Sequence, residues 1–497
     1  MTKLVVLSLL SLLAYAAVAS TEMQRRDAQQ CRLRRISASK PSHRMRSQGG
    51  VTEIWDPEED QFQCAGFAPM RDTIQTNSLS LPKFFPAPRL VYIEQGTGLM
   101  GVSYPGSQRH ITKISNFQEA RAREECQETS TRKFTGFAAE MSLPCQQEQP
   151  IGATMMVMRS SSPSLFLILT TMLTSSTKTL RGFMLAGGQS RHGQERYERS
   201  SQRYAGQSEW SHEETFHNIF RGFDEELMAE AFNVPRETVR RMRQDSNRGL
   251  IVKCLEDMRI MSPDQEEQEE FESSPRNGLE ETFCTMKIKH NIELHRQADV
   301  YTKQGGRINI ANQQKLPILQ FLDMSAERGH LMPNALYTPH WSMTDNRVVY
   351  ALRGELNAQI VDERGNTIMN ERVREGEMFV IPQFYATLMR AGNNGFEWVS
   401  FKSSSQPMKN TMAGSISVMR AMPIDVISNA YQISPREAEQ LKIEQRPAIH
   451  AAVPHQDLIL NRVFVLLATS STPWATATKD ILLVPLEKDP SGKLLCI

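Results

Sequence analysis

The chain has almost no net charge and lacks any long hydrophobic run. Its 57 Lys and Arg residues and 56 Asp and Glu residues give a formal net charge of +1. That balance argues against a dedicated nucleic-acid-binding protein, which would carry a basic excess. No apolar run reaches the roughly 18 residues that a transmembrane helix needs, which argues against a membrane-spanning protein. The 497 residues, 40% of them hydrophobic and 23% charged, have the composition of ordinary globular domains.

Cysteine is scarce, and no two of the seven cysteines form a Cys-x-x-Cys pair, which argues against a zinc ribbon or a thioredoxin-type site. The odd count leaves at least one thiol unpaired or shared with another chain. Asn-x-Ser/Thr sequons are absent, so N-glycosylation is not expected. The cysteines are Cys31, Cys64, Cys126, Cys145, Cys254, Cys284 and Cys496.

The N-terminus has the three parts of a secretory signal in order. Lys3 supplies the positive charge, 4–16 the apolar stretch, and Ala17-Val-Ala19 a small-residue cleavage site. Residues 1–20 are therefore predicted to be a signal peptide. Entry into the secretory pathway implies an oxidising compartment, in which disulfides form.

An internal repeat is the most informative feature of the organisation. Arg89-Leu-Val-Tyr-Ile-Glu-Gln-Gly96 is echoed by Arg347-Val-Val-Tyr-Ala-Leu-Arg-Gly354. Further along, Ala231-Phe-Asn-Val-Pro-Arg-Glu237 is echoed by Ala430-Tyr-Gln-Ile-Ser-Pro-Arg-Glu437. Both pairs come in the same order, so the chain contains two copies of one module.

Each module is predicted to be a strand-rich stretch closed by two short helices. The residues at 90–93 and 348–350 alternate as strands do, and each strand should end at the glycine that follows. Helical spacing over 224–232 predicts a helix capped by Asp224, and Pro235 and Pro435 should each open a further helix. Many short strands favour jelly-roll barrels, so the predicted fold is all-β dominated.

Two polar segments lack residues to bury. The region between the modules contains the acidic run 264–270 and is predicted to be a disordered, solvated linker. Residues 187–207, rich in Gly, Ser, Arg and Gln, are predicted to be a mobile loop.

Several long, ordered blocks resemble the legumin-type (11S) globulins, which are seed storage proteins. Most of 30–106, 182–252 and 277–445 is covered. The blocks are Gln30-Cys-Arg-Leu33, Gly49-Gly-Val-Thr-Glu-Ile-Trp55, Phe62-Gln-Cys-Ala-Gly66, Asn277-Gly-Leu-Glu-Glu-Thr-Phe-Cys-Thr-Met286, Gly305-Gly-Arg-Ile308, Leu316-Pro-Ile-Leu319, Ser325-Ala-Glu-Arg-Gly-His330 and Pro333-Asn-Ala-Leu-Tyr-Thr-Pro-His-Trp341.

The resemblance implies two cupin barrels, each followed by a short helical segment, and a nutrient-reservoir function. It implies a proprotein that an asparaginyl endopeptidase cuts between Asn277 and Gly278. The proprotein is expected to form trimers first and to reach the protein storage vacuole. After the cut it should assemble there, with itself or with related globulins, into hexamers. No nucleic acid, membrane or cofactor is expected to take part. The expected segments are signal peptide 1–20, N-terminal cupin module and acidic chain 21–249, linker 250–277, C-terminal cupin module and basic chain 278–447, and atypical tail 448–497.

The resemblance also implies a disulfide between Cys31 and Cys64 and a second bridge from Cys284. The family partner of Cys284 follows Tyr-Pro-Gly in the first barrel, but Ser107 stands at that position here. Cys284 is therefore expected to be free or to pair elsewhere, for example with Cys126 or Cys145.

A metal-dependent bicupin enzyme, such as an oxalate-degrading one, is the first alternative. Catalytic cupins bind a metal through a His-x-His pair, a Glu and a later His. Counting back from the repeated glycine Gly354, and using the spacing of Gly376 and Pro382 for the last position, these positions hold His340, Ser342, Arg347 and Thr387. One ligand of four cannot chelate a divalent metal, so His340 is predicted to be a packing or hydrogen-bonded histidine. The matching positions of the first module hold Pro82, Phe84 and Arg89.

No catalytic, cofactor-binding or metal-binding residue is therefore predicted, and the chain is not expected to be an enzyme. A sugar- or ligand-binding cupin is the second alternative, although no sequence motif identifies its site. A metal assay of the purified protein and a panel of small ligands would separate these classes.

Residues 135–180 do not resemble the family. The expected block His-Trp-Cys-Tyr-Asn-Asp-Gly-Asp is absent, but a one-base shift of the codons for 151–159 restores it. A similar shift over 107–112 restores the missing cysteine. The sequence therefore predicts that both stretches are read out of frame; as written, the first barrel should lose core strands and be unstable.

Overall fold

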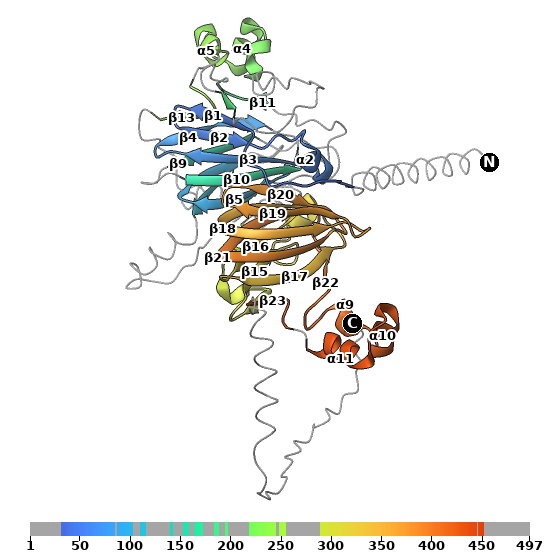
Figure 1. The fold of residues 1–497 in the computed structure, drawn as a ribbon. Coiled ribbons are helices and arrows are strands. Elements are labelled where there is room, and N and C mark those ends of the chain that lie inside the picture. Colours follow the sequence, from blue (N-terminus) through green and yellow to red (C-terminus); the bar gives the residue numbers. More distant parts are fainter. Residues whose placement is uncertain are drawn as a thin grey trace, which may run out of the picture. The chain divides into compact units, whose positions relative to one another are not determined.

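The computed structural model describes two β modules and the helices that follow each of them (Figure 1). All described residues belong to one compact unit within 1–451. The described residues are 31–84, 87–102, 110–115, 140–142, 153–158, 164–171, 183–187, 194–196, 218–244, 248–254, 289–444 and 446–451. The predicted signal peptide and nearly all of the predicted tail lie outside them.

The first module contains two sheets. Their strand orders are β12-β1-β2-β3-β10-β5-β8 and β11-β4-β9-β6-β7, with β13 beside β4. The strands are β1 (His43–Ser47), β2 (Gly50–Ile54), β3 (Phe67–Ile74), β4 (Ser78–Phe84), β5 (Arg89–Gln95), β6 (Thr97–Val102), β7 (His110–Ser115), β8 (Glu140–Ser142), β9 (Ala153–Met158), β10 (Ser164–Thr171), β11 (Phe183–Met184), β12 (Gln194–Arg196) and β13 (Ile251–Lys253).

The second module is a single ten-stranded sheet, in which the long strands β18 and β21 bend and pair with several neighbours. Strand β18 pairs with β19, β20 and β21, and β21 also joins β16 to β17. The strands are β14 (Val300–Thr302), β15 (Gly306–Ala311), β16 (Ser325–Leu331), β17 (Ala335–Ser342), β18 (Arg347–Val361), β19 (Thr367–Arg374), β20 (Met378–Ile381), β21 (Ala386–Lys402), β22 (Lys409–Thr411) and β23 (Ile449–Ala451).

Strands β5 and β10 are apolar at consecutive positions because both of their faces are buried. Val91 and Ile93 lie in the core of the first module. Leu90 and Tyr92, which point to the other face, belong to a second core that also contains residues of the second module. In β10, Phe166 and Ile168 lie in the first core, and Leu167 and Leu169 lie in the shared one.

The repeat predicted from sequence corresponds to matching strands, β5 and β18. Strand β5 ends at Gln95, directly before Gly96, as predicted. The prediction that Gly354 ends its strand is wrong, because β18 continues to Val361. Gly354 has φ +79°, and a Cβ there would lie 2.2 Å from the Gly395 carbonyl oxygen. The pairing with β21 shifts register beside it, so this glycine forms a bulge rather than a stop.

Two short helices follow each module, as predicted. The helix α4 is capped by the Asp224 carboxylate, which accepts hydrogen bonds from the amides of Glu226 and Leu227. Pro435 is the first residue of α11, behind a capping box formed by Ser434 and Glu437. Among the described residues, no helix is long and apolar enough to cross a membrane. The helices are α2 (Asp60–Ala65), α4 (Glu225–Phe232), α5 (Arg236–Met242), α8 (Leu319–Leu322), α9 (Val418–Ala421), α10 (Ile424–Tyr431) and α11 (Pro435–Ile443), with 3₁₀ turns at Ile219–Gly222 and His295–Gln297.

The prediction that Pro235 is the first helical residue of α5 is wrong. Pro235 is the N-cap, with an extended backbone at φ −58° and ψ 143°, and the helix begins at Arg236. The proline is therefore the N-cap of the second helix in the first module and the first helical residue in the second module.

Strand pairing corrects three predictions about the first module. The first module extends past 249 to Lys253, since β13 pairs with β4 and Ile251 is fully buried. The predicted loop 187–207 includes β12, which pairs with β1. The segment 135–180 supplies β10 to the middle of a sheet, so the expected loss of core strands is wrong for that strand. A continuous apolar run, which suits a strand buried on both faces, was enough to place β10 between β3 and β5.

Candidate functional site

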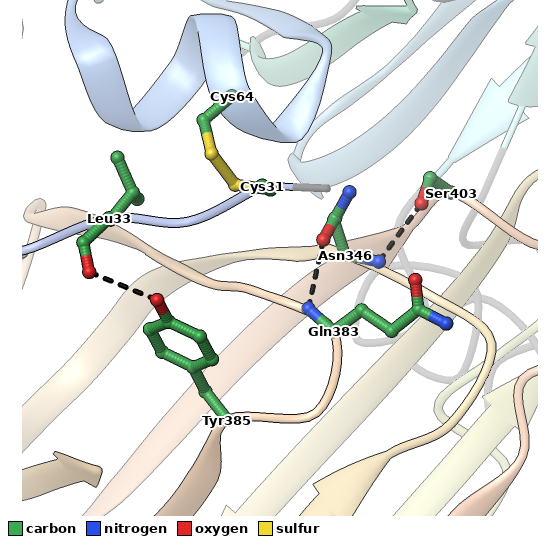
Figure 2. Close-up of a disulfide and its surroundings, with 7 residues drawn as sticks. All are labelled: Cys31, Leu33, Cys64, Asn346, Gln383, Tyr385 and Ser403. Carbon is green, nitrogen blue, oxygen red and sulfur yellow. Dashed lines mark hydrogen bonds between the residues drawn. A yellow bond between two sulfur atoms is a disulfide. The ribbon is translucent and has the colours of Figure 1, made fainter. Parts of the chain in front are cut away.

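The disulfide implied by the resemblance, Cys31–Cys64, is present (Figure 2). Cys64 lies on α2, and Phe62 and Ala65 of that helix are fully buried. Gly66 ends α2 in the left-handed region at φ 75°, and its amide donates to the carbonyls of Phe62 and Gln63. The bridge therefore ties the start of the described chain to a short, well-anchored helix.

The segment after Cys31 is bound to the second module. The Tyr385 hydroxyl donates to the Leu33 carbonyl at 3.0 Å (Figure 2). The Ile36 amide donates to the Ile368 carbonyl at 3.2 Å. Ser39 and Met378 exchange two backbone hydrogen bonds of 2.9 Å. Residues 31–39 thus join the two modules by backbone hydrogen bonds as well as by apolar packing.

The predicted processing site and the cysteines predicted to pair with Cys284 lie outside the described residues. Asn277, Gly278, Cys284 and Ser107 all lie outside the described residues, as do the suggested partners Cys126 and Cys145. Cys254, at the end of β13, is a free and partly buried thiol. Burial raises the pKa of this thiol, which lowers its reactivity.

The positions that hold metal ligands in catalytic cupins do converge inside the second module. His340 and Thr387 are directly opposite each other on β17 and β21. The His340 ring stacks on Tyr337 at 3.9 Å, and its Nδ1 lies 2.9 Å from the Thr338 carbonyl oxygen. His340 is therefore a packed and hydrogen-bonded histidine, as predicted from the sequence. Among the described residues, no group of three or more His, Cys, Asp or Glu side chains is arranged to hold a metal.

Buried ion pairs occupy the same interior. The Lys402 ammonium lies 2.7 Å from the Glu327 carboxylate, and both side chains are at most 2% exposed. Lys409 lies 3.3 Å from the same carboxylate. Burial opposes ionisation of Glu327, but Lys402, Lys409 and Arg347 hold its pKa well below the usual value. Arg347, at the position of the ligand Glu, contributes a fixed positive charge instead of a metal-binding oxygen.

The first module carries its own buried charges. Lys83 lies 3.4 Å from Asp72, whose other oxygen accepts a hydrogen bond of 2.7 Å from Thr52. Arg89, at the ligand-Glu position of this module, is 4% exposed, and burial lowers its pKa to about 9. Phe84, at another ligand position, stacks on Phe183 at 5.0 Å.

Sequence reasoning missed these ion pairs. Glu327 and Lys402 are 75 positions apart and lie in strands whose polar residues read as solvent-facing. The one usable signal was the position count, which put an arginine at the ligand-Glu position of both modules. It identified Arg89 and Arg347 but not their partners.

A second polar network joins the two modules. Arg71 of β3 donates to the Tyr350 hydroxyl of β18 and to the Glu53 carboxylate, the latter at 2.7 Å. The Tyr92 hydroxyl donates to Glu293 at 2.7 Å. Each of these bonds except that to Glu53 crosses between modules, so charged and phenolic groups support the apolar contact described above.

Glu94, near the end of β5, faces this network. One of its carboxylate oxygens is buried and makes no hydrogen bond with any described residue. Burial raises the pKa of Glu94 to about 7; Glu375 adds to the increase, while Arg71, Arg328 and Arg353 oppose it.

We expect the Glu94→Gln variant to lose part of the pH dependence of stability. Between about pH 4.5 and 7, folded Glu94 keeps a proton that the unfolded chain has released. Stability from this group is therefore greatest at the acid end and falls as pH rises, by up to about 3 kcal/mol. Urea unfolding at a series of pH values should show the variant equal to the parent near pH 4.5 and more stable above pH 7.

The matched control is Glu439→Gln, on the exposed side of α11. Its curve should run parallel to that of the parent. If Glu94→Gln also runs parallel, burial of Glu94 does not govern its titration.

The chain matches the cupin family in both of its β modules. The cupin family model matches residues 36–135 and 292–439, one match in each β module. The fold is thus a bicupin. The 11S globulin seed storage protein 2 of Sesamum indicum is 45% identical over 448 residues, covering 88% of this chain and 95% of that protein. The 11S globulin subunit beta of Cucurbita maxima is 37% identical over 431 residues, covering 84% and 87%.

Solved structures agree. The coconut allergen cocosin superposes with a TM-score of 0.69 at 31% identity, covering 85% of this chain and all of that one. A recombinant pro-11S globulin of pumpkin gives 0.68 at 32% identity, with the same coverage. The chain belongs to the 11S globulin family of seed storage proteins. Its role is storage of nutrient in the seed, and proteins of this family assemble into oligomers.

Proposed function

We propose that the chain is a non-catalytic proprotein, cut after Asn277 and assembled first into trimers and then into hexamers in the protein storage vacuole. An asparaginyl endopeptidase is the processing enzyme, and the partners are further copies or related globulins. The likeness to a pro-11S globulin over 85% of the chain is the observation that carries this proposal. Asn277 lies at the end of a polar segment, where proteolytic cleavage concentrates, and Gly278 adds no side chain to obstruct it.

Exposed apolar side chains on the helices after each module support assembly. Large apolar residues are exposed on both helical segments, although isolated domains bury such residues where they can. They suit contact between subunits, with the helices of one module covering those of another copy. The exposed residues are Phe223, Leu227 and Phe232 beside the first module, and Ile416, Val418, Val426, Tyr431, Leu441 and Ile443 beside the second.

The Asn277→Gln variant tests the proposal. Expressed in developing seed, it should reach the vacuole as a single uncut chain and stop at the trimer, because cleavage precedes hexamer formation. Reducing electrophoresis, N-terminal sequencing and sedimentation measure chain number, cut position and size.

Asn429→Gln, an exposed asparagine on α10, is the matched control and should mature normally. Cleavage of Asn277→Gln at the same position would show that the assigned processing site is wrong.

We further propose that the stretches 107–112 and 135–180 are read out of frame. Restoring the family's cysteine in place of Ser107 would give Cys284 its partner. Resequencing the transcript across codons 105–182 tests this. The present frame, found intact in transcripts and peptides of abundant seed protein, would contradict it.

A further inference from the structure

Besides Asn309 Oδ1, five buried polar atoms of the C-terminal module make no hydrogen bond with any described residue. They are His340 Nε2, Asp345 Oδ2, Arg347 Nε, Thr387 Oγ1 and Ser400 Oγ. Each of the five residues is at most 2% exposed. Folded proteins pair roughly 90% or more of their buried polar groups with protein or ordered water, so such a group of atoms requires a partner.

Strand pairing and charge interactions relate these residues to one another: Arg347 is the cross-strand partner of Lys402, and its charge acts on His340. His340 and Thr387 are cross-strand partners, and their side chains therefore share a face of the sheet. Arg347 Nε lies 3.7 Å from Asp345 Oδ2, which is too far for a direct hydrogen bond. Ser400 is the cross-strand partner of Glu327, whose ion pairs with Lys402 and Lys409 complete the group.

The chemistry of His340 is fixed by its surroundings. A carbonyl oxygen only accepts, so Nδ1 must carry the proton that it donates to Thr338. Burial, together with Arg347 and Lys409, holds the pKa of His340 well below its usual value, so the ring is neutral. Its Nε2 is then a hydrogen-bond acceptor with a lone pair directed into the interior.

The bound species must donate to some of these atoms and accept from others. His340 Nε2 and the Asp345 carboxylate accept, whereas Arg347 Nε and the Thr387 hydroxyl donate. Arg347, Lys402 and Lys409 repel a cation, and the two acceptors repel an anion. Water both donates and accepts, and buried waters typically bridge two to four such groups.

We propose that ordered water is bound inside the C-terminal barrel, between His340 Nε2, Thr387 Oγ1 and Arg347 Nε. The position is that of the metal in catalytic cupins, with its ligands replaced by groups that suit water. Asp345 Oδ2 and Ser400 Oγ extend the same hydration site toward the Arg347 and Glu327 ion pairs.

A crystal structure of the purified, assembled protein at better than about 2 Å resolution tests this directly. We expect a density peak without anomalous signal, about 2.6–3.2 Å from His340 Nε2 and from Thr387 Oγ1. An empty interior with these atoms paired directly to each other would overturn the proposal. So would a peak with the anomalous signal of a metal.

Thr387→Val gives an independent test, because it keeps the side-chain shape and removes only the hydroxyl. If water binds there, the variant should lose about 2 °C in Tm. The matched control is Thr338→Val, which removes a hydroxyl that donates to the Ala413 carbonyl at 2.9 Å and should show a similar loss. An unchanged or raised Tm for Thr387→Val, beside a lowered one for Thr338→Val, would mean that the Thr387 hydroxyl is unsatisfied and the site is dry.

Discussion

Replacing Glu327 by Gln should lower the free energy of unfolding by about 3–5 kcal/mol. The substitution keeps size and shape but removes the charge that Lys402 contacts at 2.7 Å and Lys409 at 3.3 Å. Lys402 and Arg347 would remain as buried cations at 1% and 2% exposure, and Asp345 is the carboxylate that the described residues still place near them. Buried charges that lose their partner are among the most destabilising features that a point mutation creates. Urea unfolding, followed by tryptophan fluorescence, measures the loss.

Glu355→Gln is the matched control in the same module. Its carboxylate pairs with Arg372 at 3.6 Å, but the two side chains are 40% and 58% exposed. Water screens such a pair, so the expected loss is below about 1 kcal/mol. Equal losses for the two variants would show that the Glu327 ion pairs do not stabilise the barrel. The double variant Glu327→Leu/Lys402→Met should recover much of the loss, because two apolar residues of similar volume leave less unpaired charge.

These charges mark the limit of what the sequence could predict. The repeat, the strands at 90–93 and 348–350, the Asp224 cap and the Cys31–Cys64 disulfide could all be inferred, since each depends on neighbouring residues or on a resemblance between whole blocks. The continuation of β18 through Gly354 could not, because it depends on the carbonyl of Gly395, some 40 positions later in the chain. Pro235 was misplaced by one residue because proline's fixed φ suits both the N-cap and the first helical position.

At the candidate site, too, the sequence predicted what depends on position along the chain but not what depends on contacts between distant strands. Counting residues from the repeated glycines correctly identified His340 as a packed histidine and placed an arginine at the ligand-Glu position of each barrel. The count carries no information on pairing between distant strands, so the Glu327–Lys402 and Asp72–Lys83 pairs appeared only in the structure. A continuous apolar run was likewise sufficient for β10 to take a buried place in the first barrel, although its residues do not resemble the family.

Removing the disulfide through Cys31→Ala/Cys64→Ala should cost about 3–4 kcal/mol of stability. The two cysteines are 33 positions apart, and the bridge restricts a loop of that size in the unfolded chain. In the folded protein, Leu33 and Ile36 keep their places in the shared core, and Tyr385 still donates to the Leu33 carbonyl. The variant should therefore fold and assemble, but unfold at lower urea concentration.

Amide hydrogen exchange measures local opening of residues 31–39 and is a more direct test than urea unfolding of the whole protein. Without the bridge, residues 31–39 lose their covalent tie to α2. Their hydrogen bonds to the second module should then open more often, so the Ile36 and Ser39 amides should exchange with deuterium faster than in the parent. Reduction of the parent should reproduce this change. Cys254→Ala, which removes a free and partly buried thiol, is the control and should leave both measurements nearly unchanged. If the double variant and Cys254→Ala unfold at the same urea concentration, the disulfide does not stabilise this fold, and noncovalent contacts are sufficient to hold the N-terminal segment in place.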